Sequence, residues 1–351
     1  MLILTINPGA TSTKIAIFND EDEVWKKTIE HSQCDLEPFA QVIDQLDYRM
    51  ELIDRALEEG GYSCAHFDAI CGRGGLLRHI PSGTYKVTKK VLEDIKNPPY
   101  GEHASNLGAP LSLKEAQKHG CQAYFVDPVS VDELTDIARI SGFKGMQRES
   151  FFHALNQKAV ARKASEAFGK PYEDLNLIVC HLGGGVSVAA HKHGLVVDNF
   201  NVKDEGAFGM DRGGSLPVNA VINLCFSGKT KAEIKKLLGS EAGIYSYLGT
   251  RDFREVERRA FSGEDDDAKM IFDAFAYQLC KDAGSMAAVM NFQVDAFVLT
   301  GGMANSKRLC DDISSRLAPL APVLVFPGEE EMRALALGAL RVLRGETAKE
   351  Y

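Results

Sequence analysis

Asn7-Pro8-Gly9-Ala10-Thr11-Ser12-Thr13-Lys14 lies between two apolar runs, Leu2–Ile6 and Ile15–Phe18. The pattern predicts a strand, a tight polar turn and a second strand, which we expect to form a hairpin at the edge of a larger sheet. The other half of the chain repeats it: His181-Leu182-Gly183-Gly184-Gly185 lies between Leu177–Cys180 and Val186–Ala190. Glycine lets backbone N–H groups approach an anion without a Cβ in the way. We therefore interpret both turns as phosphate-binding loops.

The composition narrows the class of protein. The 351 residues are 45% hydrophobic, which is enough for two globular domains. No apolar run approaches the ~20 residues that span a bilayer, and the N-terminus has a strand pattern rather than that of a signal peptide. The net charge of −9 disfavours a nucleic-acid partner. The eight cysteines form no C-x-x-C pair, so we expect no zinc or redox dithiol and a reducing, cytoplasmic location.

The two halves also share a buried strand that ends in glycines. One such strand is expected at 67–71, before Gly72-Arg73-Gly74-Gly75, and the other at 296–300, before Gly301-Gly302. The apolar spacing further predicts helices over 39–59, 89–95, 111–119, 149–168, 270–290 and 329–343, and strands over 122–126 and 195–198. The economical interpretation is a duplicated α/β domain with a cleft between the copies. We expect one domain over 1–128 plus 333–351, and the other over 129–332.

Two nearby motifs are discounted, and the first loop keeps a structural alternative. Ser227–Thr230 resembles the end of a P-loop, but Asn223 stands where that motif needs glycine. Gly183–Val188 approaches a dinucleotide fingerprint, but its last position is valine and a strand follows. Asn7–Lys14 could be an ordinary hairpin turn, although three hydroxyls and an amine beyond a glycine favour phosphate contact.

Single charged residues can have either a functional or a structural role. Arg73 and Arg212 are flanked by glycines, and a guanidinium in such a place needs partners, which a substrate or a structural carboxylate could supply. A lone histidine such as His103 or His153 is more often structural than catalytic. Asp127, before Pro128, could be a helix cap, and the run 329–331 could be a solvated helix start.

Taken together, the motifs resemble the acetokinase family of the actin-like, sugar-kinase-like ATP-binding superfamily, and within it the butyrate kinases. Seven ordered motifs carry the resemblance: Asn-Pro-Gly-x-Thr-Ser-Thr-Lys at 7–14, Gly-Arg-Gly-Gly at 72–75, His-Ala-Ser-Asn at 103–106, His-Leu-Gly-Gly-Gly at 181–185, Glu-Gly…Arg…Gly-Ser-Leu-Pro at 205–217, Leu-Thr-Gly-Gly at 299–302 and Pro-Gly-Glu-x-Glu-Met at 327–332. The resemblance covers nearly the whole chain. It implies duplicated actin-like (ribonuclease-H-like) α/β domains with a central active-site cleft.

The resemblance also implies residue roles. The residues implied in binding ATP or ADP are Asn7, Thr11, Ser12, Thr13, Lys14, His181, Gly183, Gly184, Gly185, Gly301 and Gly302. The implied metal site holds Mg²⁺ through Asn7, Asp127 and an acid from 329–331, for which we choose Glu331. The implied catalytic residues are Arg73, Arg212, His153 and Asp127, and Arg148 matches a further family arginine. Arg73, Gly75, Phe152 and Arg212 are implied to bind the carboxylate substrate.

Some positions depart from the acetate-kinase pattern. Lys14 stands where those enzymes usually have arginine, Gln157 replaces a second histidine, and the motif around His103 aligns loosely. Gly75 replaces a bulky valine of the acyl pocket, and Lys203 replaces a proline. Loss of the valine would make room for a four-carbon chain.

The implied reaction is reversible phosphoryl transfer between ATP and butyrate, or a branched analogue such as isobutyrate. Acetate or propionate are alternative substrates, and a sugar kinase or an actin-like ATPase are alternatives of other classes. Family members imply a homodimer or a larger homo-oligomer. No nucleic-acid or membrane partner is expected.

Overall fold

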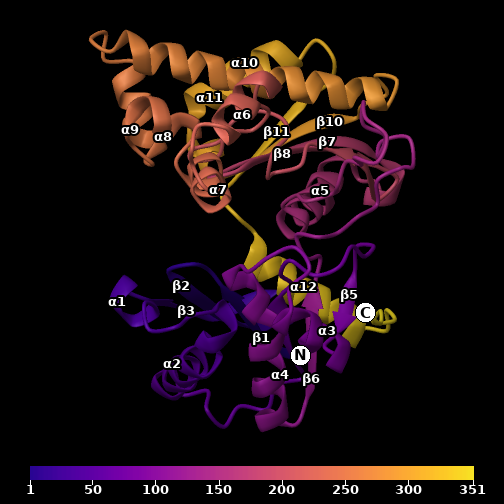
Figure 1. Ribbon diagram of the computed structural model, residues 1–351. Helices are drawn as coiled ribbons and strands as arrows, with labels where there is room; N and C mark the ends of the chain where they lie inside the picture. The colour runs from indigo at the N-terminus through magenta and orange to yellow at the C-terminus, as the bar shows by residue number, and fades with distance from the viewer. The chain divides into compact units, whose positions relative to one another are not determined.

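The computed structural model describes residues 1–351, which pack into two compact units. The first unit contains residues 1–132, 154–159 and 330–351, and the second contains 133–153 and 160–329. The last helix, α12 (Glu331–Leu343), belongs to the first unit (Figure 1). Residues 154–159 also belong to it, although we expected them in the second domain.

A six-stranded sheet forms the centre of the first unit. Its strands are β1 (Leu2–Pro8), β2 (Ser12–Asn19), β3 (Asp22–Glu30), β4 (Ala69–Arg73), β5 (Thr84–Lys86) and β6 (Gln122–Val126), in the order β3-β2-β1-β4-β6-β5. The first three are antiparallel, whereas β4 runs parallel to β1 and β6 parallel to β4. The expected position of the first hairpin at the sheet edge is wrong, because the largely exposed β3 pairs with β2 and β4 pairs with β1.

Helices cover both faces of this sheet because its strands are apolar on both sides. On one face α2 (Leu46–Glu59) and α4 (Gly108–His119) form a core with Leu4, Ile6 and Ile70. On the other face α12 packs on Ile3, Phe18 and other strand side chains that point away from the first core. The shorter helices are α1 (Gln33–Leu36) and α3 (Lys89–Lys96), with 3-10 turns at Val42–Gln45 and Ala104–Leu107.

The second unit repeats the sheet of the first. Its strands are β7 (Asn176–Leu182), β8 (Val186–Lys192), β9 (Leu195–Asn199), β10 (Ala296–Gly301) and β11 (Val323–Pro327), in the order β11-β10-β7-β8-β9. Here again three consecutive strands are antiparallel, and two later strands extend the sheet in parallel from the first of them. The predicted duplication of an α/β domain is therefore confirmed.

Helices also cover the second sheet on both faces (Figure 1). The long α10 (Asp266–Val289) lies on one face, in a core with residues of α8 (Gly243–Leu248), α9 (Phe253–Ala260) and α11 (Lys307–Leu317). The second half of α5 (Ala154–Phe168) packs on the other face. The remaining elements are α6 (Val218–Cys225), α7 (Lys231–Ser240) and 3-10 turns at Tyr172–Asp174 and Gly302–Asn305.

The start of α5 differs from the expected helix over 149–168. Residues 149–153 are not helical, because their polar groups bond to neighbouring segments instead. The Phe151 carbonyl accepts from Val202 N at 2.8 Å, and Ser150 Oγ accepts from Asn199 Nδ2 at 2.9 Å. The sequence pattern does not reveal these distant partners.

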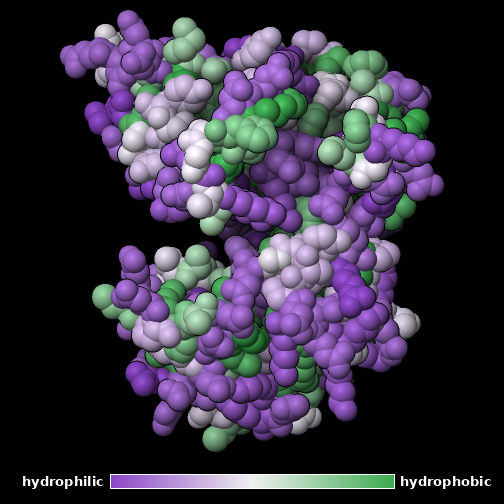
Figure 2. Space-filling view, viewed as in Figure 1, coloured by the Kyte–Doolittle hydropathy of each residue, from purple (hydrophilic) through white to green (hydrophobic).

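Three further features of the fold concern its helices, its cysteines and its surface. None of the helices combines the length and the apolar character needed to cross a bilayer. All eight cysteines are unpaired. Hydrophobic side chains gather on the surface around α6, where Val218, Ile222 and Phe226 are exposed (Figure 2).

Candidate active site

Three predicted site residues lie side by side at one edge of the first sheet. Asn7, Arg73 and Asp127 stand at the carboxyl ends of β1, β4 and β6. The register pairs Ile6 with Gly72, and Arg73 with Val126. Ligands of open α/β sheets bind outside the carboxyl ends of parallel strands. The sheet topology therefore brings these three residues to one candidate site.

Glu331, at the start of α12, joins two of them in a cluster. Arg73 Nη1 and Nη2 bind Glu331 Oε2 and Oε1 at 3.0 and 2.9 Å. Asn7 Nδ2 donates to Glu331 Oε2 at 2.7 Å, and its Oδ1 accepts from Arg73 Nη1 at 3.4 Å. Asn7 and Glu331 are each only 6% exposed. In this conformation the Glu331 carboxylate fixes Arg73. A structural carboxylate was one of the two partners expected for this arginine.

Asp127 has an unusual backbone conformation beside this cluster. Its φ is +36°, which is uncommon for a residue other than glycine. Its Oδ1 accepts from Gly83 N at 2.7 Å, and its own N–H donates to Gly83 O at 3.2 Å. Its Oδ2 accepts no hydrogen bond. A buried carboxylate with one free oxygen at a sheet edge is a candidate metal ligand.

The donor set suits a magnesium ion that is held mainly by its substrate. No group of three or more His, Cys, Asp or Glu side chains forms a complete metal cage. Mg²⁺ in phosphoryl-transfer sites is usually held by one or two carboxylates together with substrate phosphates. Asp127, Glu331 and the Asn7 side-chain oxygen have the right chemistry for that role. Their assignment as metal ligands stays a prediction.

The glycine loop after β1 is stabilised by Arg49, a residue that the sequence motifs did not indicate. Gly9 N donates to Ser12 O at 2.7 Å, which closes the turn. The buried Arg49 of α2 donates from Nη1 to Gly9 O, Ser12 O and Thr13 Oγ1, at 3.0, 3.2 and 2.9 Å. Burial lowers the pKa of Arg49 to about 10. Arg49 therefore fixes the shape of the loop, although it lies on an ordinary-looking amphipathic helix.

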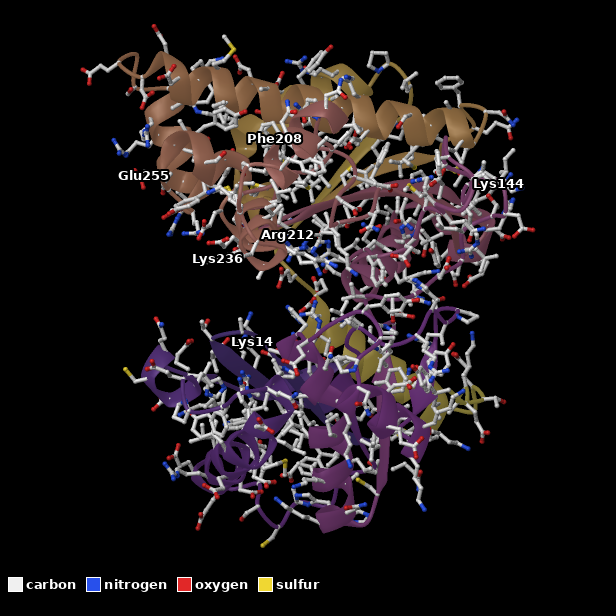
Figure 3. The ribbon with its side chains drawn as sticks, viewed as in Figure 1. Lys14, Lys144, Phe208, Arg212, Lys236 and Glu255 are labelled. Atoms are coloured by element: carbon white, nitrogen blue, oxygen red, sulfur yellow. The ribbon has the colours of Figure 1, made fainter.

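One predicted phosphate ligand in this loop, Thr13, has a structural role in this conformation. Thr13 is fully buried, and its hydroxyl lies between Arg49 and His31 Nε2, which is 2.8 Å away. In this conformation the Thr13 hydroxyl supports the loop, and its assignment as a nucleotide ligand stays a prediction. The exposed Thr11 and Lys14 and the half-buried Ser12 remain accessible; Figure 3 labels Lys14 at the start of β2.

Gly75 also has a packing role. A Cβ on Gly75 would lie 2.1 Å from Asn106 Oδ1 and 2.5 Å from Asn106 Cα. Asn106 Oδ1 in turn accepts from Leu76 N at 2.8 Å. His103, in the same motif, caps the 3-10 turn by accepting from Ser105 N at 3.2 Å. The close approach of this turn thus explains the glycine without an acyl pocket, whose link to Gly75 stays a prediction.

The second glycine loop joins β7 and β8 and packs tightly against the segment around Arg212. A Cβ on Gly209 would lie 2.3 Å from Gly184 O, and one on Gly185 would lie 2.7 Å from Arg212 Nη1. These close approaches explain why glycine is needed in both segments. They also place the Arg212 guanidinium directly beside the loop.

Arg212 differs from Arg73 in having no protein partner. Its guanidinium forms no hydrogen bond or ion pair, although the residue is largely buried. Burial lowers the pKa of Arg212, and the nearby Asp211 carboxylate offsets part of that effect. A partly buried cation with free donors is costly to keep unless solvent or a ligand uses those donors. Arg212 is therefore the strongest candidate anion-binding residue in the second unit.

His153 and His181 form a stacked pair near the same loop. Their ring centroids are 3.7 Å apart with an interplanar angle of 11°. His153 Nδ1 lies 2.8 Å from Ser187 Oγ, which orients the ring. His181 is the next-to-last residue of β7, and its Nε2 lies 3.9 Å from Glu329 Oε1. Phe152 is fully buried, and its predicted contact with the substrate stays a prediction.

A cavity of about 580 Å³ opens beside the glycine residues of the second unit. Gly183, Gly184 and Gly302 line it, together with Arg251, Phe253, Asn305, Ser306 and other residues of α9 and the turn after β10. Gly301 has a φ of +90°, and a Cβ there would lie 2.4 Å from Leu182 O. The volume suits a nucleoside-sized ligand. The sequence motifs indicated only the glycines of this cavity.

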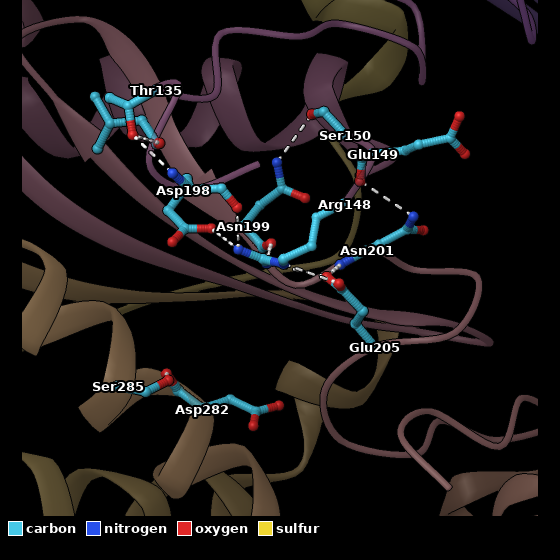
Figure 4. A network of polar contacts seen from close by, with 12 residues as sticks. Thr135, Arg148, Glu149, Ser150, Asp198, Asn199, Asn201, Glu205, Asp282 and Ser285 are labelled. Carbon is cyan, nitrogen blue, oxygen red and sulfur yellow. Dashed lines mark hydrogen bonds and ion pairs between the residues drawn. The ribbon is translucent and has the colours of Figure 1, made fainter. Parts of the chain in front are cut away.

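Arg148 lies in a network of hydrogen bonds and ion pairs within the protein (Figure 4). Its guanidinium donates to both Glu205 oxygens at 2.9 and 3.0 Å and to Asp198 Oδ1 at 2.9 Å. It also donates to the carbonyls of Ala138 and Asn199, at 2.9 and 2.6 Å. The hydrogen bonds to Glu205 are the main cause that raises the pKa of Arg148 above its ordinary value. Because its donors are used within the protein, Arg148 anchors the segment before His153.

Comparison with known proteins shows the family of the chain. Residues 143–321 match the acetokinase family. Butyrate kinase 2 of Clostridium acetobutylicum is 48% identical over 352 residues, which cover 99% of this chain and 99% of that protein.

Two solved structures share the fold. The acetate kinase of Porphyromonas gingivalis matches with a TM-score of 0.80 and 20% identity, over 97% of this chain and 99% of that one. A propionate kinase from Francisella tularensis matches with a TM-score of 0.76 and 19% identity, over 95% and 98%. These matches confirm the predicted duplicated actin-like α/β class. With its family match and its full-length relative, the chain belongs to the acetokinase family.

Proposed function

We propose that this chain is a carboxylate kinase that transfers the γ-phosphoryl group of ATP to butyrate or a branched analogue such as isobutyrate. The products are an acyl phosphate and ADP, and the reaction is reversible. Membership of the acetokinase family and the full-length similarity to a butyrate kinase support this activity.

The free Arg212 guanidinium is the observation that carries the proposal. A carboxylate is already ionised at neutral pH, so its phosphorylation needs no general base. The enzyme must instead hold two anions in line and neutralise the charge of a loose transition state. A largely buried arginine with all donors free, beside a triple-glycine turn, suits that task.

The other residues receive complementary roles in the proposal. Arg73 binds the substrate carboxylate or the moving phosphoryl group, with Glu331 fixing its orientation. His153, oriented by Ser187, donates to the phosphoryl oxygens. The cavity beside Gly183 and Gly302 holds the nucleoside. When bound, Mg²⁺ would be held by Asp127, Glu331 and Asn7 and would neutralise phosphate charge.

We also infer a homo-oligomer in the cytoplasm. The oligomer rests on the family resemblance, and the exposed apolar side chains around α6 are of the kind that such a contact covers. The location rests on the eight unpaired cysteines, which suit a reducing compartment.

Hydroxylamine trapping of acyl phosphate tests the function. The wild-type protein, ATP and Mg²⁺ are incubated with acetate, propionate, butyrate, isobutyrate or glucose, and both hydroxamate and ADP are measured. We expect the highest hydroxamate yield with the four-carbon acids. ADP release without hydroxamate from any acid would contradict the proposal, and glucose-dependent ADP release would favour a sugar kinase. The same assay on Arg212→Ala tests the role of that arginine, and we expect it to lose roughly 10²-fold or more in kcat/KM. Arg316→Ala, which removes an exposed arginine paired with Asp312 on α11, is its control and should keep wild-type activity.

A further inference from the structure

We propose that the segment Lys349–Tyr351, which lies outside every motif, positions Asp127 and the loop that follows Arg73. The inference rests on the proposed function, because it assigns these residues to the support of that site. Lys349 and Tyr351 make side-chain contacts with the loop 76–83 or with the residues that hold it. They contact none of the residues predicted to bind substrate or nucleotide.

Lys349 attaches the segment to β5 through a single parallel β-bridge with Tyr85. Its N–H donates to Thr84 O at 2.8 Å, and its carbonyl accepts from Lys86 N at 3.1 Å. Its Nζ donates to Ser82 O at 2.5 Å. The stem of the same side chain covers Gly83, where a Cβ would lie 3.0 Å from Lys349 Cδ and Cε. Lys349 therefore holds residues 82–84 from both the main chain and the side chain.

Gly83 transmits this support to Asp127. It exchanges two hydrogen bonds with Asp127, one to the backbone and one to the carboxylate, at 3.2 and 2.7 Å. Asp127 has a positive φ, a conformation that persists only where neighbouring structure imposes it. Gly83 itself has a φ of +145° that suits glycine. The path from Lys349 to the free oxygen of Asp127 thus runs through a single residue.

Tyr351 holds the other end of the same loop. Its hydroxyl donates to Asp94 Oδ2 at 2.7 Å and accepts from Arg78 N at 2.9 Å. Arg78 completes the arrangement with two bonds to the Asp94 carboxylate, at 2.6 and 2.8 Å. The Tyr351 ring packs edge-on against Phe125 of β6, with centroids 6.3 Å apart. Tyr351 therefore fixes the loop that leaves Arg73, and it also touches the strand that leads to Asp127.

The strand ends of Arg73 and Asp127 are also coupled directly. A Cβ on Gly74 would lie 2.6 Å from Pro128 Cβ, so the residues that follow the two strands are in close contact. A shift of the loop 76–83 would therefore move both strand ends. Misplacement of a charged group at a phosphoryl-transfer site lowers turnover without removing any substrate contact. Lys349 and Tyr351 are positioning residues in this sense.

The experiment compares Lys349→Met, Tyr351→Phe and the double variant with Lys86→Met. Lys86 is the matched control, since it lies on the same strand edge, and its Nζ faces only Glu350, at 3.9 Å. Acyl phosphate formation is measured as a function of butyrate, ATP and Mg²⁺. Binding of Mn²⁺ in the presence of ADP is measured separately by electron paramagnetic resonance, and thermal unfolding reports the integrity of the fold.

We expect the double variant to need at least threefold more Mg²⁺ for half-maximal velocity and to lose roughly three- to tenfold in kcat. In the double variant the KM for ATP should change less than twofold, and Mn²⁺ binding should weaken in parallel. The conservative single variant Lys349→Arg, in contrast to Lys349→Met, should have wild-type values. Unchanged metal dependence and unchanged Mn²⁺ binding in a folded double variant would overturn the inference. Equal losses in Lys86→Met would also overturn it. If the wild-type protein formed no acyl phosphate, the proposed function would fail, whereas the Mn²⁺ measurement would still decide whether the segment positions Asp127.

Discussion

Arg73 and Glu331 form a two-point ion pair at 3.0 and 2.9 Å although 258 positions separate them in the chain. The side chains are only 18% and 7% exposed, so solvent screens the pair weakly. The pair joins the end of β4 to the start of α12. Arg73, at the carboxyl end of β4, is therefore oriented by the last helix of the chain.

Removal of the carboxylate tests what this pair contributes. Glu331→Gln keeps the shape of the side chain but leaves Arg73 without its anionic partner. We expect kcat/KM for butyrate to fall by one to two orders of magnitude, as for other groups that position charge at a developing anion. Steady-state kinetics at saturating Mg²⁺ measures the effect. Wild-type kinetics in the variant would show that Glu331 serves only the packing of α12.

The two glycine-flanked arginines should differ in their effect on stability. Arg73→Ala leaves a buried carboxylate unpaired, which costs on the order of 3 kcal/mol, whereas Arg212→Ala removes a largely buried cation that has no partner. We expect a clear drop in Tm only for Arg73→Ala. Both variants should lose roughly 10²-fold or more in kcat/KM. Calorimetry and trapping assays on the same preparations separate the two quantities, and normal turnover in Arg212→Ala would remove it from the site.

His153 should act on turnover more than on nucleotide affinity. We expect His153→Ala to lower kcat while the Kd for ADP changes little, because the imidazole donates where charge accumulates on the transferring group. Ser187→Ala, which removes the hydroxyl 2.8 Å from Nδ1, should show a smaller loss of the same kind. Isothermal calorimetry gives the Kd. A large loss of affinity with unchanged kcat would assign His153 to ground-state binding instead.

The first glycine loop should become less stable in acid. Burial, with a smaller contribution from Arg49, lowers the pKa of His31 to about 4. The unfolded chain binds a proton at His31 near pH 6.5, but the folded chain does not, so folding stability falls as pH drops from about 6.5 to 4. The loss can reach roughly 3 kcal/mol. Denaturant unfolding at several pH values measures it, and His31→Gln should flatten this part of the profile; an unchanged profile would contradict the assignment.

Gly75→Val should act on folding before it acts on specificity. The new side chain would overlap Asn106, and forced overpacking costs typically 1–3 kcal/mol. We expect a lower Tm and a reduced yield of folded protein. A stable variant in which the ratio of butyrate to acetate kcat/KM falls would instead support Gly75 as part of the acyl pocket. Chain-length profiles and thermal unfolding on one preparation distinguish these outcomes.

The amino-acid sequence by itself determined the local features of this protein. Alternating apolar runs around glycine turns predicted the hairpins at 1–18 and 177–190. Helical spacing predicted α4 and α10 within four residues at each end, and it predicted the end of α2, which begins seven residues later than expected. These features depend on near neighbours in the chain, so they are visible without the fold. The ordered motifs likewise indicated the family and the strand ends that carry Asn7, Arg73 and Asp127.

Only the tertiary structure decided what each of these residues contacts. The Thr13 hydroxyl is buried against Arg49, and Asn106 occupies the space where a side chain at Gly75 would lie. Arg73 is paired with Glu331. Arg212 kept its donors free, which the glycines around it could not reveal. The partners lie tens to hundreds of residues apart and meet only when helices and loops pack on the sheets. No local pattern in the chain encodes which distant side chain fills a given space.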